Sequence, residues 1–165
     1  MYSMTPFIKD LGVYSLAIRL KQLHETMVHS ARSLYKSLDL DIEPNWHLIF
    51  KLLQEHEELS VTEIAEAIQF SHPSVISIIG KMKERGFLLT RSDPSDSRRQ
   101  LISLSEAAKE KLPEFEKVWD ASAVVIEEML PKDVDFYQIL DSMGEYFMEE
   151  SYELRTLKQL SNDQK

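Results

Sequence analysis

Ser74, Ser77 and Lys81 follow one another at intervals of three and four residues, which places them on one face of a helix. Hydroxyl groups can donate or accept hydrogen bonds at base edges and phosphates, and this small polar face would enter a major groove without clashing. The apolar residues of the same stretch recur at helical spacing and face the other way: Val75, Ile78, Ile79 and Met82. The pattern predicts a helix that reads duplex DNA.

Local signals bound this helix and predict another before it. The residue before Pro73 resists the helical region, so a new helix begins near Ser71, its N-cap. Gly86 follows the run Lys-Glu-Arg, where a left-handed C-terminal residue is favoured. Ser60 and Glu63 have the spacing of a capping box, which starts the preceding helix. The two helices predict a helix-turn-helix.

A charged hairpin follows the helix pair. Two β-capable runs, residues 87–91 and 98–104, flank the turn-forming residues 92–97. Its base and tip carry Arg91, Arg98 and Arg99, where they can reach phosphates or a narrow minor groove. An ordinary charged hairpin on a solvated face explains the same residues. The neighbouring helix pair favours the DNA interpretation.

This segment resembles the DNA-binding lobe of the MarR family of bacterial transcriptional regulators. The family's wing carries Asp-x-Arg, then five residues, then Leu-Thr; this chain has Asp96-Ser97-Arg98 and later Leu104-Ser105. Ser105 replaces the usual threonine, and either hydroxyl can cap the following helix. The resemblance implies that Arg98 is the wing's DNA-contacting arginine and that Asp96 braces the wing through an ion pair.

Length and composition fit one domain, residues 1–165, that buries a sizeable core. The chain has no cysteine, which excludes disulfides and thiolate metal sites and fits a cytoplasmic protein. No apolar run approaches a membrane span, and residues 1–6 lack the features of a signal peptide, so we expect neither export nor membrane insertion.

The net charge of −9 argues at first against a polyanionic partner. Its distribution answers that objection, because residues 81–99 hold 6 basic and 3 acidic side chains. The positive charge is therefore local to the predicted reading surface. Since this excess is small, we expect a moderate DNA affinity that depends strongly on salt.

Long amphipathic helices flank the winged-helix lobe, residues 44–104. One helix is expected over residues 5–38, with an interruption near residues 30–31, and two over residues 105–160, the last reaching about Leu160. These helices carry more apolar surface than the lobe can cover, so residues 5–38 and 105–160 are predicted to form a dimerisation region. A monomer that packs them internally is the alternative. The fold class is mainly α with a small β-hairpin wing.

Aromatic and mixed-polarity residues cluster near the expected junction between the lobe and the long helices: Tyr14, His24, Trp46, Phe50, Phe115 and Trp119. The MarR resemblance implies a small-molecule effector pocket there, taking an aromatic ligand. A plain hydrophobic core explains the same residues, because aromatics at helical spacing usually pack.

The sequence offers little for catalysis or metal binding. The five histidines show no paired ligand spacing, and a zinc site from His24, Glu25 and His47 competes with ordinary polar histidines. The serines show no nucleophile motif and the four glycines form no phosphate loop. We predict no enzymatic activity, cofactor or metal.

The sequence therefore predicts a homodimeric, ligand-responsive transcriptional repressor that binds a pseudo-palindromic operator in double-stranded DNA. A winged-helix module that binds another protein is the alternative. The residues expected at DNA are His72, Ser74, Ser77, Lys81, Lys83, Arg85, Arg91, Arg98 and Arg99. Ser74, Ser77 and Lys81 are expected to read bases, and the others to position the protein. His72 is placed either to touch phosphate or to face solvent.

Overall fold

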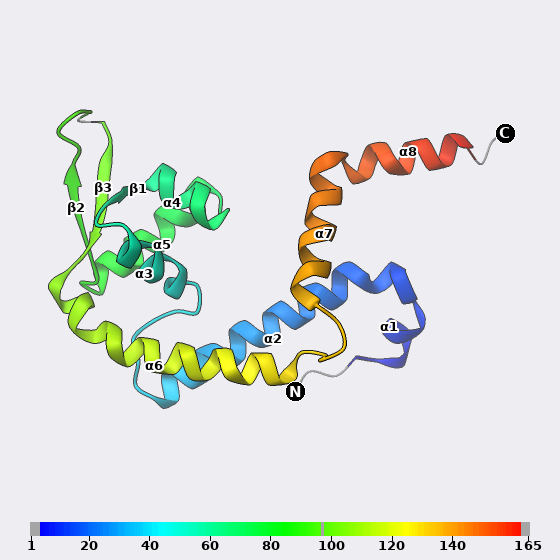
Figure 1. Cartoon of the computed structure of the whole chain (residues 1–165), viewed down its shortest axis with the longest axis horizontal. Helices are drawn as coiled ribbons and strands as arrows, with labels where there is room; N and C mark the ends of the chain where they lie inside the picture. Colours follow the sequence, from blue (N-terminus) through cyan, green and yellow to red (C-terminus); the bar gives the residue numbers. More distant parts are fainter. Residues whose placement is uncertain (1–3, 97, 163–165) are drawn as a thin grey trace. The chain divides into compact units, whose positions relative to one another are not determined.

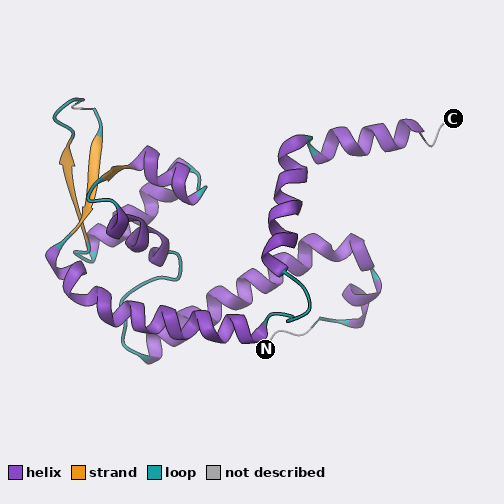
Figure 2. Ribbon diagram, in the orientation of Figure 1, coloured by secondary structure: helices purple, strands orange, loops and turns teal. Residues whose placement is uncertain are grey.

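The computed structural model describes residues 4–96 and 98–162, which form helices and one small antiparallel sheet (Figures 1 and 2). The chain divides into two compact units, Met1–Phe115 and Glu116–Lys165. The mainly α fold class with a β-hairpin wing is confirmed.

The first unit begins with α1 (Pro6–Asp10), a short 3-10 turn η1 (Gly12–Ser15) and α2 (Leu16–Ser37). Thr5 caps α1 ahead of the proline, as its sequence predicts. The expected interruption near residues 30–31 is wrong, because α2 runs through them unbroken. The break lies instead at Gly12, whose φ of +53° is a conformation that L side chains rarely adopt.

Arg19 stabilises this break. Its Nε donates to the hydroxyl of Ser15 over 2.7 Å, and its Nη2 donates to the carbonyl of Ile8 over 3.0 Å. The Ser15 hydroxyl in turn donates to the carbonyl of Gly12, and Ser15 is buried. One guanidinium thus satisfies carbonyl groups at the end of α1 that the broken helix leaves without a partner.

The winged-helix lobe follows α2, and its helices and hairpin occur in the order that the sequence predicts. A three-stranded antiparallel sheet has the order β1-β3-β2, and β2 and β3 extend beyond the helices as a hairpin (Figure 1). The short strand β1 was not expected from the sequence. The elements are α3 (Trp46–Glu55), β1 (Leu59–Ser60), α4 (Val61–Ile68), α5 (His72–Glu84), β2 (Leu88–Ser92) and β3 (Gln100–Leu104).

The predicted helix ends in this lobe are confirmed. The backbone amide of Glu63 donates to the Ser60 hydroxyl over 3.3 Å, and the Ser60 amide donates to the Glu63 carboxylate over 2.8 Å, which completes the capping box. The Ser71 side chain caps α5 by accepting from the amide of Ser74. Gly86 has a φ of +75°, as a residue that ends a helix often does.

An aromatic cluster forms the centre of the lobe. Phe87 meets Trp46, Phe50 and Phe115 edge-on, with ring centroids 5.5 to 6.0 Å apart. All four side chains are buried. Edge-to-face contacts add to the hydrophobic contribution of burial. Because Phe87 follows the end of α5, this cluster fixes α5 against α3 and Phe115.

The helix α6 (Glu106–Met129) begins in the first unit and ends in the second. Ser105 caps it, as predicted, by accepting from the amide of Ala108 over 3.0 Å, and Pro113 lies inside it. Only the part of α6 that follows Phe115 belongs to the second unit.

The second unit continues with α7 (Phe136–Glu149) and α8 (Tyr152–Asn162). The expectation of a single last helix reaching Leu160 is wrong. Glu150 has extended backbone angles, and the hydroxyl of Ser151 accepts from the amide of Leu154, which caps a new helix. The apolar period continues across this corner, so periodicity alone did not reveal it.

Candidate nucleic-acid interface

The helix α5 presents the predicted polar face. Val75, Ile79 and Met82 are buried, while Ser74, Ser77 and Lys81 are exposed. The buried row fixes the rotation of the helix about its axis. The exposed row is therefore held toward solvent by packing on its opposite side.

The exposed polar residues of α5 differ in how they are bonded. The hydroxyl of Ser74 lies 2.8 Å from that of Ser71 at the helix start. Within residues 4–96 and 98–162, the hydroxyl of Ser77 has no hydrogen bond and Lys81 and Lys83 form no ion pair. His72 is exposed in the first turn. Ser77, Lys81 and Lys83 are thus free for an external partner.

Arg99, at the end of the hairpin turn, is bound to the first helix of the pair. Its Nη2 lies 2.5 Å from the Glu63 carboxylate and donates to the Ser60 hydroxyl over 3.1 Å. Its Nη1 lies 3.9 Å from Asp93. The bond from Arg99, with those from Ser60, lowers the pKa of Glu63 to about 2. Arg99 therefore ties the wing to the capping box.

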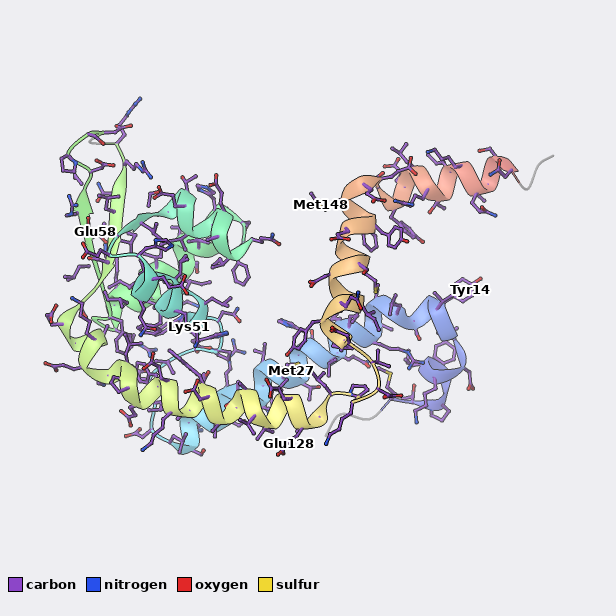
Figure 3. All side chains as sticks on the ribbon, viewed as in Figure 1. Tyr14, Met27, Lys51, Glu58, Glu128 and Met148 are labelled. Carbon is purple, nitrogen blue, oxygen red and sulfur yellow. The ribbon has the colours of Figure 1, made fainter. Side chains whose placement is uncertain are left out.

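Arg91 forms a second such tie. Its Nε donates to Glu58 over 2.6 Å, and its Nη2 donates to the other carboxylate oxygen of Glu58, so the pair is bidentate. The bond from Arg91 lowers the pKa of Glu58. Figure 3 labels Glu58 beside the hairpin. Arg91 thus connects β2 to the loop that precedes β1.

Arg85, at the C-terminal end of α5, also has partners inside the chain. It forms an ion pair with Asp41 and donates to the Asp41 carbonyl over 3.2 Å. Its guanidinium carbon lies 5.8 Å from the ring centroid of Trp46. These contacts connect the end of α5 to the loop before α3.

Arg98 is different, because its side chain is 90% exposed. Its only ion pair in the described part of the chain is with Asp96, two residues earlier, at 3.1 Å. Asp96 also accepts from the backbone amide of Arg98 over 3.0 Å, and the two bonds lower the pKa of Asp96. The predicted pair between Asp96 and the wing is therefore present. Ser97, the middle residue of the motif, lies outside the described residues.

The six cations of residues 81–99 thus fall into two groups. Arg85, Arg91 and Arg99 are bound by acidic side chains elsewhere in the lobe, whereas Lys81, Lys83 and Arg98 extend into solvent. Sequence reasoning missed Glu58 and Glu63 as partners. These contacts follow from the pairing of β1 with β3, which places Ser60 opposite Leu101 and so brings the start of α4 close to Arg99. No local sequence pattern predicts this pairing.

The residues named for an effector pocket are not gathered in one place. Trp46, Phe50, Phe115 and Trp119 are buried, whereas His24 and Tyr14 are exposed, Tyr14 by 89%. Tyr14 precedes α2 and Trp46 follows it, so a 22-residue helix, about 33 Å long, separates them. Figure 3 shows Tyr14 far from Lys51 of α3.

An open pocket of about 390 Å³ lies elsewhere, between the end of α2, the loop 39–43 and Arg85. Two of its cations, Arg32 and Arg85, are paired with Glu43 and Asp41 across its wall. It is therefore a charged depression rather than an aromatic cavity.

Neither a metal site nor a membrane span is found in the described part of the chain. No three metal-ligating side chains come together there, so the set His24, Glu25 and His47 is not assembled. Among the helices of residues 4–96 and 98–162, none has the length and apolar character needed to cross a membrane.

Comparisons with known proteins agree with this geometry. The model of the MarR family matches residues 40–99. The HTH-type transcriptional repressor IacR of Pseudomonas putida is 26% identical over 110 residues, which cover 67% of this chain and 62% of that repressor's length. The chain thus matches less than two thirds of that relative.

Solved structures show the same fold. The MepR–DNA complex of S. aureus superposes with a TM-score of 0.67 and 17% identity, covering 82% of this chain and 98% of that one. PcaV of Streptomyces coelicolor, solved with its natural ligand, gives a TM-score of 0.66 and 17% identity, covering 88% and 98%. The MarR family model thus matches the segment that forms most of the winged-helix lobe, and the chain shares its fold with these solved regulators.

Proposed function

We propose that the protein is a sequence-specific DNA-binding transcriptional regulator that acts as a repressor. One observation carries this proposal: α5 exposes Ser77, Lys81 and Lys83, which have no side-chain partner among the described residues, beside a wing that exposes Arg98. A helix that is buried on one face and polar on the other can enter the major groove. An exposed arginine on the wing can contact phosphate or the minor groove. The relatives support the proposal, because IacR is a repressor and MepR was solved with DNA.

The contacts inside the lobe favour a division of roles among its cations. Ser74, Ser77 and Lys81 read bases, while Lys83, Arg98 and His72 position the protein on the DNA backbone. Arg85, Arg91 and Arg99 act through the fold, since each is already held by a carboxylate. An arginine that leaves such a pair for a phosphate must break one ion pair to form another. Arg98 is paired only within the wing turn, with Asp96, and its side chain is 90% exposed, so we expect it to contribute more to affinity than these three arginines.

The working form is a homodimer, with the interface on residues 5–38 and 105–160. The single chain leaves Leu20, Leu23, Met27 and Leu34 of α2 exposed by 36 to 45%. In the second unit, α7 and α8 expose apolar side chains as well, Phe147 and Leu157 among them. Long apolar rows of this kind require a partner surface, and a two-fold copy supplies one. Such a dimer presents two copies of α5 about 34 Å apart, one turn of DNA.

Control by a small aromatic effector is the second part of the proposal, supported by the ligand complex of PcaV. Trp46, Phe50 and Phe115 form a closed core in this chain, so they offer no vacant site. A ligand site that includes Tyr14 therefore requires a second copy, since Tyr14 lies at the other end of α2. The ligand weakens DNA binding if it changes the separation of the two reading helices.

The proposed activity is binding without catalysis, and DNA as the target implies action in the cytoplasm. The alternative, a winged-helix module for protein partners, rests on the net charge of −9. The exposed cations Lys81, Lys83 and Arg98 of the lobe and the DNA complex of MepR argue against it.

Selection of duplexes from a random library at near-physiological salt tests the proposal. We expect the wild type to enrich an inverted repeat, and Arg98→Ala to bind that repeat more weakly. The control is Lys51→Ala, which removes another exposed cation of the lobe, one that the proposal places neither at DNA nor at the dimer interface. A folded dimer that enriches no sequence, with effector absent or present, would contradict the proposal and favour a protein partner.

A further inference from the structure

Ile76 is the apolar exception on the exposed side of α5. Its neighbours Val75 and Ile79 are buried, but Ile76 is 57% exposed and contributes little to the core. Single exposed apolar residues are common, so exposure alone means little. The position of Ile76 is more informative, because it lies next to Ser77 on the helix that the proposed function assigns to base reading.

Gly80 is the second exception. A glycine inside a helix destabilises it relative to alanine, and glycine is usually retained where something must approach the backbone closely. Gly80 lies in the interior of α5, and a Cβ built there meets no atom within 4 Å. Its φ lies outside the left-handed region. Neither packing within the described chain nor backbone conformation therefore requires a glycine at this position.

Ile76 and Gly80 are four residues apart, so they adjoin each other along the helix surface. The next row is formed by Ser77 and Lys81, also four apart. The outward surface of α5 thus combines the branched apolar side chain of Ile76, the backbone at Gly80 that no side chain covers, the hydroxyl of Ser77 and the ammonium group of Lys81.

We propose that Ile76 is a specificity residue that contacts the C5-methyl group of a thymine in the major groove, and that Gly80 admits the DNA edge close to the helix. This inference rests on the proposed DNA-binding function. The thymine methyl is the one apolar group that base edges present there, and aliphatic side chains are its natural partners. A protein partner fits less well, because hydroxyl and ammonium groups surround Ile76 rather than a continuous apolar patch.

The test uses a duplex that the wild-type protein selects from a random library. Each thymine of this duplex is replaced in turn by deoxyuridine, which removes only the C5-methyl group. We expect one position in each half-site to weaken wild-type binding roughly fourfold, the loss of one buried methyl contact. Ile76→Ala should bind the unmodified duplex more weakly and should not respond to deoxyuridine at that position.

Ser74→Ala is the matched control, since it changes another exposed residue of α5 and leaves Ile76 in place. It should keep the response to deoxyuridine. If the wild type selects a duplex but no deoxyuridine substitution weakens binding, or if Ile76→Ala still responds, the inference is wrong while the proposed function stands. If the wild type selects no duplex, both fall together.

Gly80→Ala tests the other half of the inference. Because the added methyl meets no atom inside the chain and alanine favours helix, we expect the melting temperature to stay the same or rise. We expect DNA affinity to fall at least fivefold at the same time. Equal affinity in Gly80→Ala and wild type would remove Gly80 from the reading surface.

Discussion

The guanidinium of Arg99 lies 2.5 Å from the carboxylate of Glu63, and this pair joins the wing to the start of α4. Glu63 has two tasks in one side chain, because it also accepts the amide of Ser60 in the capping box. The start of the helix pair and the end of the hairpin turn therefore share one carboxylate.

Glu63→Gln separates these two tasks. Glutamine retains the capping-box bond but loses the ion pair with Arg99. Both partners are more than two-fifths exposed, so solvent screens the pair, and we expect the free energy of unfolding to fall by only about 0.5 kcal/mol. DNA affinity should fall more clearly than stability, because the wing loses a support. Urea unfolding and DNA titration measure the two, with exposed Glu66→Gln of α4 as the control that should change neither.

The pH dependence of stability offers a separate test of the same pair. The pKa of Glu63 falls from 4.5 to about 2 on folding, so the unfolded chain binds this proton at a higher pH than the folded chain does. The stabilisation is present in full above pH 4.5 and is lost as the pH falls toward 2. The stability difference between wild type and Glu63→Gln should therefore shrink over this range. A difference that stays constant between pH 6 and pH 2.5 would mean that the pair contributes nothing.

Arg98 and Arg99 are adjacent in sequence and should behave differently on substitution. Arg98→Ala removes a cation that is 90% exposed and paired only within the wing turn, so we expect binding to weaken by about 1–3 kcal/mol and the salt slope of log K to drop by about 1 per subunit, with unfolding nearly unchanged. Arg99→Ala breaks the contacts to Glu63 and Ser60, so it should lower the urea midpoint as well. Identical profiles for the two variants would refute the division of roles among the cations.

The lobe was predictable from the sequence because its signals are local. The serine caps at Ser60 and Ser71, the proline of the second helix and the glycine after it act within a few residues. Such signals need no knowledge of distant contacts. The family's wing motif added Asp96 and Arg98, whose ion pair is also local.

The missed features depend on contacts between distant residues or on breaks that the apolar pattern conceals. Arg91 and Arg99 meet carboxylates 33 and 36 positions earlier, and only the register of β1 on β3 brings them together. The turn at Gly12 depends on Arg19 reaching back to Ile8, which no helical pattern reveals. Among the aromatic residues named for a ligand pocket, Trp46, Phe50 and Phe115 pack into a core, whereas Tyr14 is exposed at the other end of α2.

Substitution in the aromatic core tests whether it is packing rather than a binding site. Phe50 is fully buried and contacts the rings of Phe87 and Phe115, so Phe50→Ala should reduce the free energy of unfolding by about 3–5 kcal/mol. Calorimetry or urea titration measures the loss. Tyr14→Ala is the contrasting variant, since Tyr14 is 89% exposed and should leave stability of the isolated chain nearly unchanged. A small effect at Phe50 would instead suit a loosely filled, ligand-accepting site.

Leu23→Glu tests the proposed second-copy surface on α2. Leu23 is 40% exposed in the single chain, so a charge there need not disturb the lobe, but it would be buried against a partner in a dimer. We expect the wild type to sediment as a dimer and Leu23→Glu to dissociate at concentrations at least tenfold higher than the wild type. His29→Glu adds the same charge to an exposed position of α2 off the apolar row, and it should stay dimeric. A Leu23→Glu protein as dimeric as the wild type would place the interface away from this row. Once dissociated, the Leu23→Glu variant should also lose tight binding to an inverted repeat, because one lobe alone contacts only a half-site.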